Sequence, residues 1–115
     1  MTTHVDLAGG RWATLSLAAQ LANVGSEVDR AIAAWAGGGG AQRSDRFERA
    51  LARALELFDL TARDSRWSGH RRREILRARE EFCRLFFDDG VPASAVPSLR
   101  KYFLQFALLA RRRSA

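Results

Sequence analysis

Apolar residues recur along the chain with the three-and-four spacing of amphipathic helices, in four segments separated by polar or glycine-rich breaks. The first segment runs from about residue 13 to 36, and Gly37 to Gly40 end it. The second can be capped by Ser44 or Asp45 and continues to about Arg63. The apolar stripes of these two segments are Leu17, Leu21, Val24, Val28, Ile32 and Trp35, and Phe47, Leu51, Ala54, Leu55, Phe58 and Ala62.

A polar break at residues 64–69 precedes the third segment, about residues 70–88, which Asp88, Asp89 and Gly90 end. Pro97 fits the first turn of a fourth segment, roughly residues 95–112. The inward residues of these segments are Ile75, Leu76, Phe82, Cys83 and Phe86, and Leu99, Tyr102, Phe103, Phe106 and Ala110. Four helices with short connections predict an all-α fold, an antiparallel up-down four-helix bundle formed by residues 11–115, with residues 1–10 as a flexible tail.

One arginine interrupts the apolar pattern. Arg79 lies near the middle of the apolar face of the third helix, where an unpaired charge is costly. We predict that it pairs with Glu27, and that Asn23 or Gln20 accepts its remaining hydrogen bonds. In the alternative, Arg79 extends to the edge of the bundle and Glu27 is solvated. The first helix also has an edge of small residues that permits close helix approach, namely Ala18, Ala22 and Gly25.

Composition narrows the class of protein. A chain of 115 residues and 12.8 kDa is too short for a multidomain enzyme, and its 47% apolar share argues against disorder. No stretch approaches the ~20 apolar residues of a membrane span, so we expect no membrane partner. The single cysteine, Cys83, excludes an internal disulfide and a two-cysteine zinc site. Because the first ten residues carry no secretory signal, we expect a cytoplasmic protein. We expect no metal or cofactor, since His4 belongs to the predicted tail.

Charge is the main clue to function. The chain carries a net charge of +6, and 18 of its 19 basic residues are arginine, with Lys101 the exception. Residues 63–79 hold seven basic and two acidic residues, and residues 111–115 hold three basic and none acidic. The two other stretches, 1–62 and 80–110, each have one more acidic than basic residue. The excess is therefore concentrated at the start of the third helix and at the end of the fourth.

These arginines predict binding of RNA or DNA through backbone phosphates. Three of them occupy the first turn of the third helix, where the helix dipole disfavours cations and favours a bound anion. The predicted contacts are Arg71, Arg72 and Arg73 in that turn, Arg77 and Arg84 along the outer ridge, Arg46, Arg49 and Arg53 on the second helix, and Arg111, Arg112 and Arg113 at the C-terminal end. The alternative is a solvated surface that Glu48, Glu56, Glu80 and Glu81 neutralise.

Two further features leave alternatives open. Trp67 can stack on an exposed base or pack over a helix junction. Leucines off the main apolar stripes predict a homo-oligomer, unless they are scattered surface residues. These leucines are Leu57 and Leu60 on the second helix and Leu104 and Leu108 on the fourth.

Catalysis is not expected from the sequence. Arg63, Asp64 and His70 resemble the motif of helical nucleases in prokaryotic defence systems. That resemblance implies His70 as general acid or base and Arg63 as the group that stabilises the phosphorane. Ser68 and Gly69 interrupt the helix where the motif needs rigidity, so we predict no catalytic residues. The nuclease remains an alternative.

Several stretches carry a family resemblance: SLAAQLANVGSEVDRA at 16–31, FERALARALELFDLT at 47–61, residues 77–87, and YFLQFALLAR at 102–111. They resemble an uncharacterised family of small bacterial and archaeal proteins with no established activity. In architecture and charge the chain is also similar to the four-helix bundles encoded in ribosomal RNA intervening sequences. It is likewise similar to the accessory variability protein of diversity-generating retroelements, a basic oligomeric bundle that partners a reverse transcriptase and RNA. This likeness implies an accessory subunit of a nucleic-acid enzyme. The alternative is a protein-interaction module without nucleic-acid binding.

Overall fold

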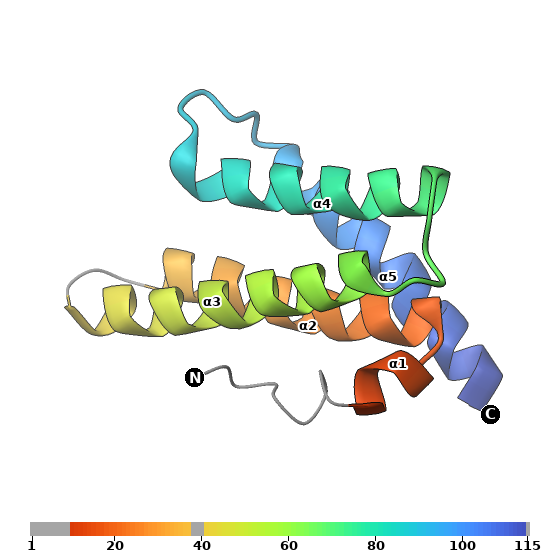
Figure 1. Cartoon of the computed structure of the whole chain (residues 1–115). Helices are drawn as coiled ribbons and strands as arrows, with labels where there is room; N and C mark the ends of the chain where they lie inside the picture. The colour runs from red at the N-terminus through yellow and green to blue at the C-terminus, as the bar shows by residue number, and fades with distance from the viewer. Residues whose placement is uncertain (1–9, 38–40, 115) are drawn as a thin grey trace.

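The chain is built from α-helices (Figure 1). A computed structural model describes residues 10–37 and 41–114, with the side chains of 41–44, 113 and 114 outside the described part. In these ranges the elements are all helices: α1 (Trp12–Thr14), α2 (Leu17–Ala36), α3 (Ala41–Arg63), α4 (His70–Phe87) and α5 (Ala95–Ser114). The all-α prediction is confirmed. The predicted tail, which includes His4, lies outside the described residues except for Gly10.

The first predicted helix is divided into two elements. Ser16 has an extended backbone, and its Oγ accepts a hydrogen bond from the Ala19 amide at 3.1 Å. This N-cap starts α2 at Leu17, four residues later than predicted. The preceding residues form the single turn of α1, which buries Trp12 at 3% exposure.

The other helix ends follow local signals with one exception. Gly37 is the C-cap of α2, as predicted, whereas Gly38 to Gly40 lie outside the described residues. The predicted caps Ser44 and Asp45 are wrong, because α3 already begins at Ala41. The Asp45 carboxylate instead pairs with Arg49 one turn later, at 3.2 Å. Gly69 precedes α4 with a φ of +57°, which favours glycine.

The packing of the four long helices decides which ends meet. α2 packs against α3 and α5, and α4 packs against the same two neighbours. The start of α2, the end of α3, the start of α4 and the end of α5 all lie on the right-hand side of Figure 1, as α1 does. Because α5 crosses the other helices, its end lies well below the start of α4 in that view. We call this side the α1 end of the molecule. The opposite end, which we call the far end, holds the end of α2 and the start of α3.

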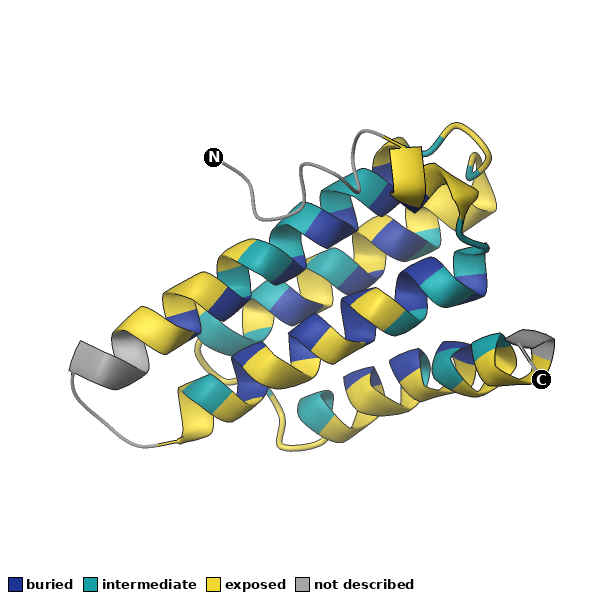
Figure 2. Ribbon diagram, turned by 90° about the horizontal axis from the view of Figure 1, so that it is seen from below, coloured by how far each residue is buried: buried dark blue, intermediate teal, exposed yellow. Residues whose placement is uncertain are grey.

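The core lies between these helices, where the buried positions of each helix face inward (Figure 2). Phe58 of α3 is fully buried, and its ring contacts the rings of Phe82 and Phe103 at centroid distances of 5.7 and 5.9 Å. Gly25 brings α2 close to α5, since a Cβ at this position would lie 2.7 Å from the Cβ of Phe103. The predicted close approach along the small-residue edge of α2 is therefore confirmed at Gly25.

Three apolar residues lie on faces other than those predicted. Leu57, predicted on an outer face, is 2% exposed, and Leu60 packs against the core. The reason is that α3 lies between α2 and α4, so its buried face is broader than one stripe. Leu76, predicted inside, is 46% exposed because Ile75, Ala78 and Phe82 are the α4 residues that enter the core.

Candidate nucleic-acid interface

The first turn of α4 carries three consecutive arginines on the surface. Arg71, Arg72 and Arg73 are exposed, and none of them forms an ion pair with another described residue. The turn has no side-chain cap and no acidic residue to offset the helix dipole. Cations at the positive end of a helix dipole are unfavourable unless an anion is present. The geometry therefore leaves three guanidinium groups available to an external anion.

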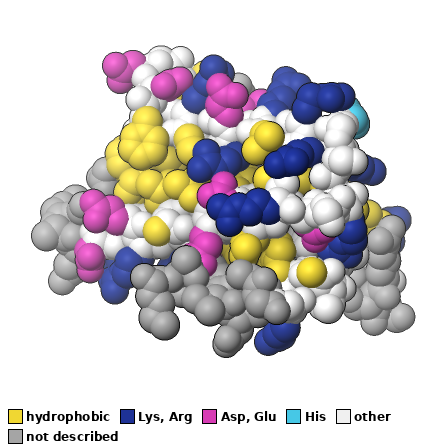
Figure 3. All heavy atoms as spheres, in the orientation of Figure 1, with side chains coloured by type: hydrophobic (Ala, Val, Ile, Leu, Met, Phe, Trp, Pro, Cys, Tyr) yellow, Lys and Arg dark blue, Asp and Glu magenta, His cyan; other side chains and the backbone are white. Residues whose placement is uncertain are grey.

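Further arginines share the α1 end with this turn. Arg63 ends α3, Arg11 precedes α1, and Arg111 and Arg112 lie in the last turns of α5. All four are exposed, and within the described ranges none has an ion-pair partner. In Figure 3 most Lys and Arg side chains lie in the right-hand half of the view, towards the α1 end. The two basic stretches of the sequence thus both lie on the right-hand side of Figure 1, but at separate places, since the start of α4 is at the top of that view and the end of α5 is at the bottom. The side chain of Arg113 is not described.

The predicted ridges differ from this end, because all of their arginines except Arg46 are paired with acids. Arg77 and Arg84 of α4 face Glu81 and Glu80 at 3.5 and 3.4 Å, and Arg84 also faces Asp88 at 3.5 Å. On α3, Arg49 pairs with Asp45, as described above, and Arg46 is exposed near the far end. Neutralisation by neighbouring acids, the alternative drawn from the sequence, describes the ridges better than it describes the α1 end.

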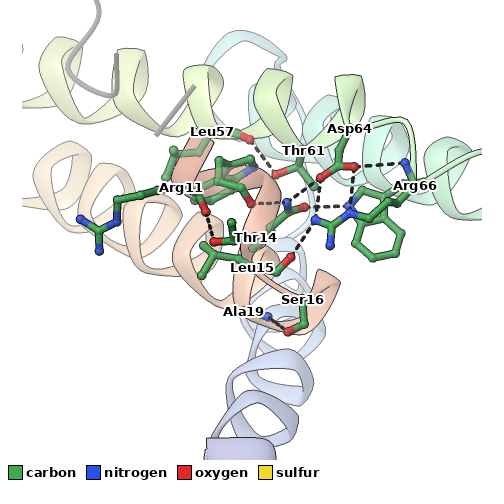
Figure 4. A network of polar contacts seen from close by, with 12 residues as sticks. Arg11, Thr14, Leu15, Ser16, Ala19, Leu57, Thr61, Asp64 and Arg66 are labelled. Carbon is green, nitrogen blue, oxygen red and sulfur yellow. Dashed lines mark hydrogen bonds and ion pairs between the residues drawn. The ribbon is translucent and has the colours of Figure 1, made fainter. Parts of the chain in front are cut away.

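A hydrogen-bonded cluster holds the segment that leads into α4 (Figure 4). Arg66 donates from its backbone amide and from Nε to Oδ1 of Asp64, at 3.1 and 3.0 Å, and from Nη2 to Oδ2 at 2.7 Å. The same Nη2 donates to the Leu15 carbonyl at 2.7 Å. These hydrogen bonds from Arg66 hold the pKa of Asp64 well below its ordinary value, against the opposing effect of burial. The connection between α3 and α4 is thereby fastened to the start of α2.

Gln20 extends this cluster into the core. Its side chain is fully buried, and Nε2 donates to the Trp12 carbonyl and to Oδ2 of Asp64, both at 2.9 Å. Its Oε1 accepts a hydrogen bond from Nε1 of Trp67 at 2.7 Å. This cluster is not predicted from the sequence, in which residues 64–69 are interpreted as a polar break between two helices. A signal was present in that break, since it combines Asp64, Arg66 and Trp67.

Trp67 packs over the helix junction, which was one of its two predicted roles. The side chain is half-buried against the core, and the Arg66 guanidinium lies 4.8 Å from the ring centroid. The indole N–H is bound to Gln20. The ring edge and one ring face are therefore already occupied by protein groups, which leaves little of Trp67 for stacking on a base.

The predicted pair of Glu27 and Arg79 is wrong. Arg79 donates from Nε to Oδ1 of Asp59 on α3 at 3.1 Å, because α4 packs directly against α3. Glu27 accepts instead from Arg30 at 2.6 Å and from Arg53 at 3.4 Å. Arg53, predicted to contact phosphate, is thus a half-buried partner of Glu27.

The two proposed acceptors of Arg79 are also engaged elsewhere. Asn23 is exposed and donates to the Ala19 carbonyl of its own helix at 2.8 Å, and Gln20 belongs to the cluster with Asp64 and Trp67. Neither contacts Arg79 in the described hydrogen bonds.

The nuclease-like residues are separated by the same cluster. Arg63 and His70 are exposed on either side of it, and Asp64 between them is occupied by Arg66 and Gln20. His70 Nε2 lies 3.6 Å from Oε2 of Glu74, whose other oxygen accepts a hydrogen bond from the Tyr102 hydroxyl at 2.9 Å. Among the described residues no group of three His, Cys, Asp or Glu side chains is arranged to hold a metal ion.

Comparison of the chain with protein-family models, curated proteins and solved structures finds no match. Within the described ranges, no helix combines the length and the apolar character that crossing a membrane requires.

Proposed function

We propose that this protein is a non-enzymatic, basic helical bundle that binds RNA or DNA through backbone phosphates. In this proposal α2 to α5 act as an antiparallel up-down four-helix bundle, and the nucleic acid contacts the α1 end. The observation that supports the proposal is the turn of three consecutive exposed arginines at the start of α4, Arg71, Arg72 and Arg73, which have no ion-pair partners among the described residues. As the likeness to bundles that accompany nucleic-acid enzymes implies, we infer a cytoplasmic accessory subunit, for example of a reverse transcriptase.

Phosphate is the anion that this arrangement suits best. A guanidinium is planar and always charged, and it presents paired donors to two phosphate oxygens. The first turn of α4 adds free backbone N–H groups and the positive end of its dipole. Contacts of this kind position a nucleic acid without reading its bases. The half-buried, partly covered Trp67 is consistent with binding that does not depend on base stacking.

The proposed contact set is narrower than the one predicted from sequence. It keeps Arg71, Arg72, Arg73, Arg111 and Arg112, and it adds Arg11 and Arg63 because they share the α1 end. It leaves out the paired arginines of the ridges, and Arg46, which lies near the far end. The contact set predicted from sequence did not include Arg11, which lies in a stretch whose charges nearly balance, or Arg63, which is the first residue of the basic stretch 63–79.

The test compares two triple variants with the same change in net charge. R71Q/R72Q/R73Q removes three arginines without ion-pair partners, and R49Q/R77Q/R84Q removes three that are paired with acids. Binding to a labelled duplex and a labelled single strand of about 20 nucleotides is measured by fluorescence anisotropy over a range of salt. We expect the first triple to lose affinity at least about tenfold and the second to lose about twofold or less. Equal losses in both triples, or no binding by the wild type at low salt, would overturn the proposal.

A protein-interaction module is the second candidate, and one observation favours it. Leu104 and Leu108 of α5 are 55% and 47% exposed, as predicted for a contact surface. The other predicted pair, Leu57 and Leu60, belongs to the core and no longer supports self-association.

A further inference from the structure

The outer face of α5 combines leucines with basic residues and lacks any acidic residue. Helix α5 has no Asp or Glu in its 20 residues. At 3.6 residues per turn, six of its exposed residues fall within an arc of about 120°, and Gln105 and Leu109 extend the exposed face beyond it. The six are Arg100, Lys101, Leu104, Leu108, Arg111 and Arg112. Figure 2 shows exposed positions along the outer side of this helix. The opposite side buries Leu99, Phe103 and Phe106, so Leu104 and Leu108 are not needed for the core.

A shallow groove runs beside the leucines, between α5 and α2. Its volume is about 230 Å³, and Leu104 lies on its border. The groove floor is lined by small side chains, including Ala22, Ser26 and Ala107, where Gly25 allows the two helices to approach closely. Small side chains between two helices leave room for apolar side chains of a third helix. The ion pair of Arg100 and Asp29, at 3.1 Å, closes one end of the groove.

Both ends of this face of α5 carry basic residues. Arg100 and Lys101 precede the leucines, and Arg111 and Arg112 follow them, about 17 Å away along the helix axis. A second copy packed on this face would place cations opposite cations in either direction, since parallel and antiparallel alignments both pair basic ends. Like charges that face each other across an interface oppose association. The face therefore suits an acidic partner better than another copy of itself.

The same face is poor for insertion into a bilayer. Amphipathic helices that bind membranes bury a broad apolar face that includes Trp or Phe. The large apolar side chains exposed on the described part of α5 are Leu104, Leu108 and Leu109, none of which is aromatic. A groove with one apolar wall and basic ends instead has the shape and charge of a site for an acidic amphipathic helix.

We propose that the leucine face of α5 docks an acidic amphipathic helix of a protein partner. Apolar residues of that helix, spaced by three and four, pack on Leu104 and Leu108 and into the α2–α5 groove. Its acidic residues, about 11 positions apart, pair with Lys101 at one end and with Arg111 and Arg112 at the other, since Arg100 is already paired with Asp29. This interaction goes beyond nucleic-acid binding and does not depend on it.

The probe for the test is a synthetic helical peptide of about 18 residues, with leucines on one face and glutamates at both ends. One control peptide has the same composition with the leucines spread around the helix, and another has lysines in place of the glutamates. Binding to the full chain is measured by calorimetry. We expect saturable binding of the first peptide and at least about tenfold weaker binding of both controls.

Variants locate the site on the protein. L104N/L108N and K101E are expected to weaken binding of the acidic peptide at least about tenfold, since all three side chains are exposed and their removal leaves the core intact. L76N is the matched control, because Leu76 is exposed to a similar extent on α4 and is expected to change affinity by about twofold or less. Circular dichroism of each variant checks that the fold is retained. None of these variants alters Arg71, Arg72 or Arg73, so nucleic-acid binding measured in the same samples separates the two proposals, which share Arg111 and Arg112.

Several results would overturn this proposal. Failure of the acidic peptide to bind, or equal binding of the peptide with spread leucines, rules out a specific helix site. Binding to vesicles of anionic phospholipid that is lost in L104N/L108N, without peptide binding, assigns the face to a membrane surface. A dimer in light scattering that the same variant converts to a monomer assigns the face to a second copy.

Discussion

Nε1 of Trp67 donates a 2.7 Å hydrogen bond to Oε1 of Gln20, a side chain with no exposure to solvent and 47 positions earlier in the sequence. Gln20 lies in α2, and Trp67 lies in the connection that leads to the arginines at the start of α4. The contact therefore fixes the position of the proposed phosphate-binding turn relative to the core.

Replacing Gln20 with Leu is expected to destabilise the protein by about 1–3 kcal/mol, because the N–H of Trp67 loses its acceptor, and the Trp12 carbonyl and Asp64 each lose a donor. Urea denaturation followed by circular dichroism measures the change. The control is Asn23→Ala, an exposed position on the same helix, for which we expect a change within about 0.5 kcal/mol. Equal effects of the two substitutions would contradict the importance of this contact.

Asp64 is expected to make stability depend on pH in the acid range. Its pKa is lower in the folded state than in the unfolded chain, so its contribution is present above the unfolded value and is lost as pH falls below it. The urea midpoint of the wild type should therefore fall between about pH 5 and pH 2, and more steeply than that of Asp64→Asn. Asp89→Asn, at an exposed carboxylate, is the control and should keep the wild-type slope. Parallel pH profiles for the wild type and Asp64→Asn would refute the assigned role.

Gly25→Ala is expected to lower stability although alanine is the better helix former. The new Cβ would lie 2.7 Å from the Cβ of Phe103, so α2 and α5 must move apart at a buried contact. We expect a loss of about 1–3 kcal/mol, whereas Ser26→Ala at the exposed neighbouring position should be nearly neutral. Thermal unfolding distinguishes the two, and an increase in melting temperature for Gly25→Ala would show that the helices can separate without cost.

The arginines at the start of α4 are expected to contribute to nucleic-acid binding and not to the stability of the fold. R71Q/R72Q/R73Q removes cations from the positive end of the helix dipole, so its melting temperature should stay equal or rise by up to about 3 °C. A clear drop in melting temperature would mean that these arginines have a structural role.

The helical segments could be predicted from sequence because their apolar spacing is regular, and the ends of α2, α4 and α5 followed from local signals at Gly37, Asp88 and Pro97. The residues that pair between different helices could not be predicted in this way. Spacing within α4 identifies Arg79 as a charge on an apolar face, but it does not reveal which helix faces it, and Asp59 of α3 takes the place predicted for Glu27.

The candidate site shows the same limit. The sequence localises the basic excess to two stretches, but only the packing of the helices places the start of α4 and the end of α5 on the same side of the molecule in Figure 1. Neutralisation of the α4 ridge arginines follows from the sequence, since Arg77 and Glu81, and Glu80 and Arg84, are four residues apart in a helix. The buried role of Gln20 depends on Asp64 and Trp67, which lie more than 40 positions away, and no local pattern indicates it.

The salt dependence of nucleic-acid binding tests the central claim most directly. If Arg11, Arg63, Arg71, Arg72, Arg73, Arg111 and Arg112 each contact one phosphate, the logarithm of the affinity for duplex DNA should fall linearly with the logarithm of the salt concentration, with a slope of about −6.3. The slope should flatten by about 2.7 in R71Q/R72Q/R73Q and stay unchanged in R49Q/R77Q/R84Q. A slope near zero for the wild type, or equal flattening in both triples, would contradict phosphate binding at the α1 end.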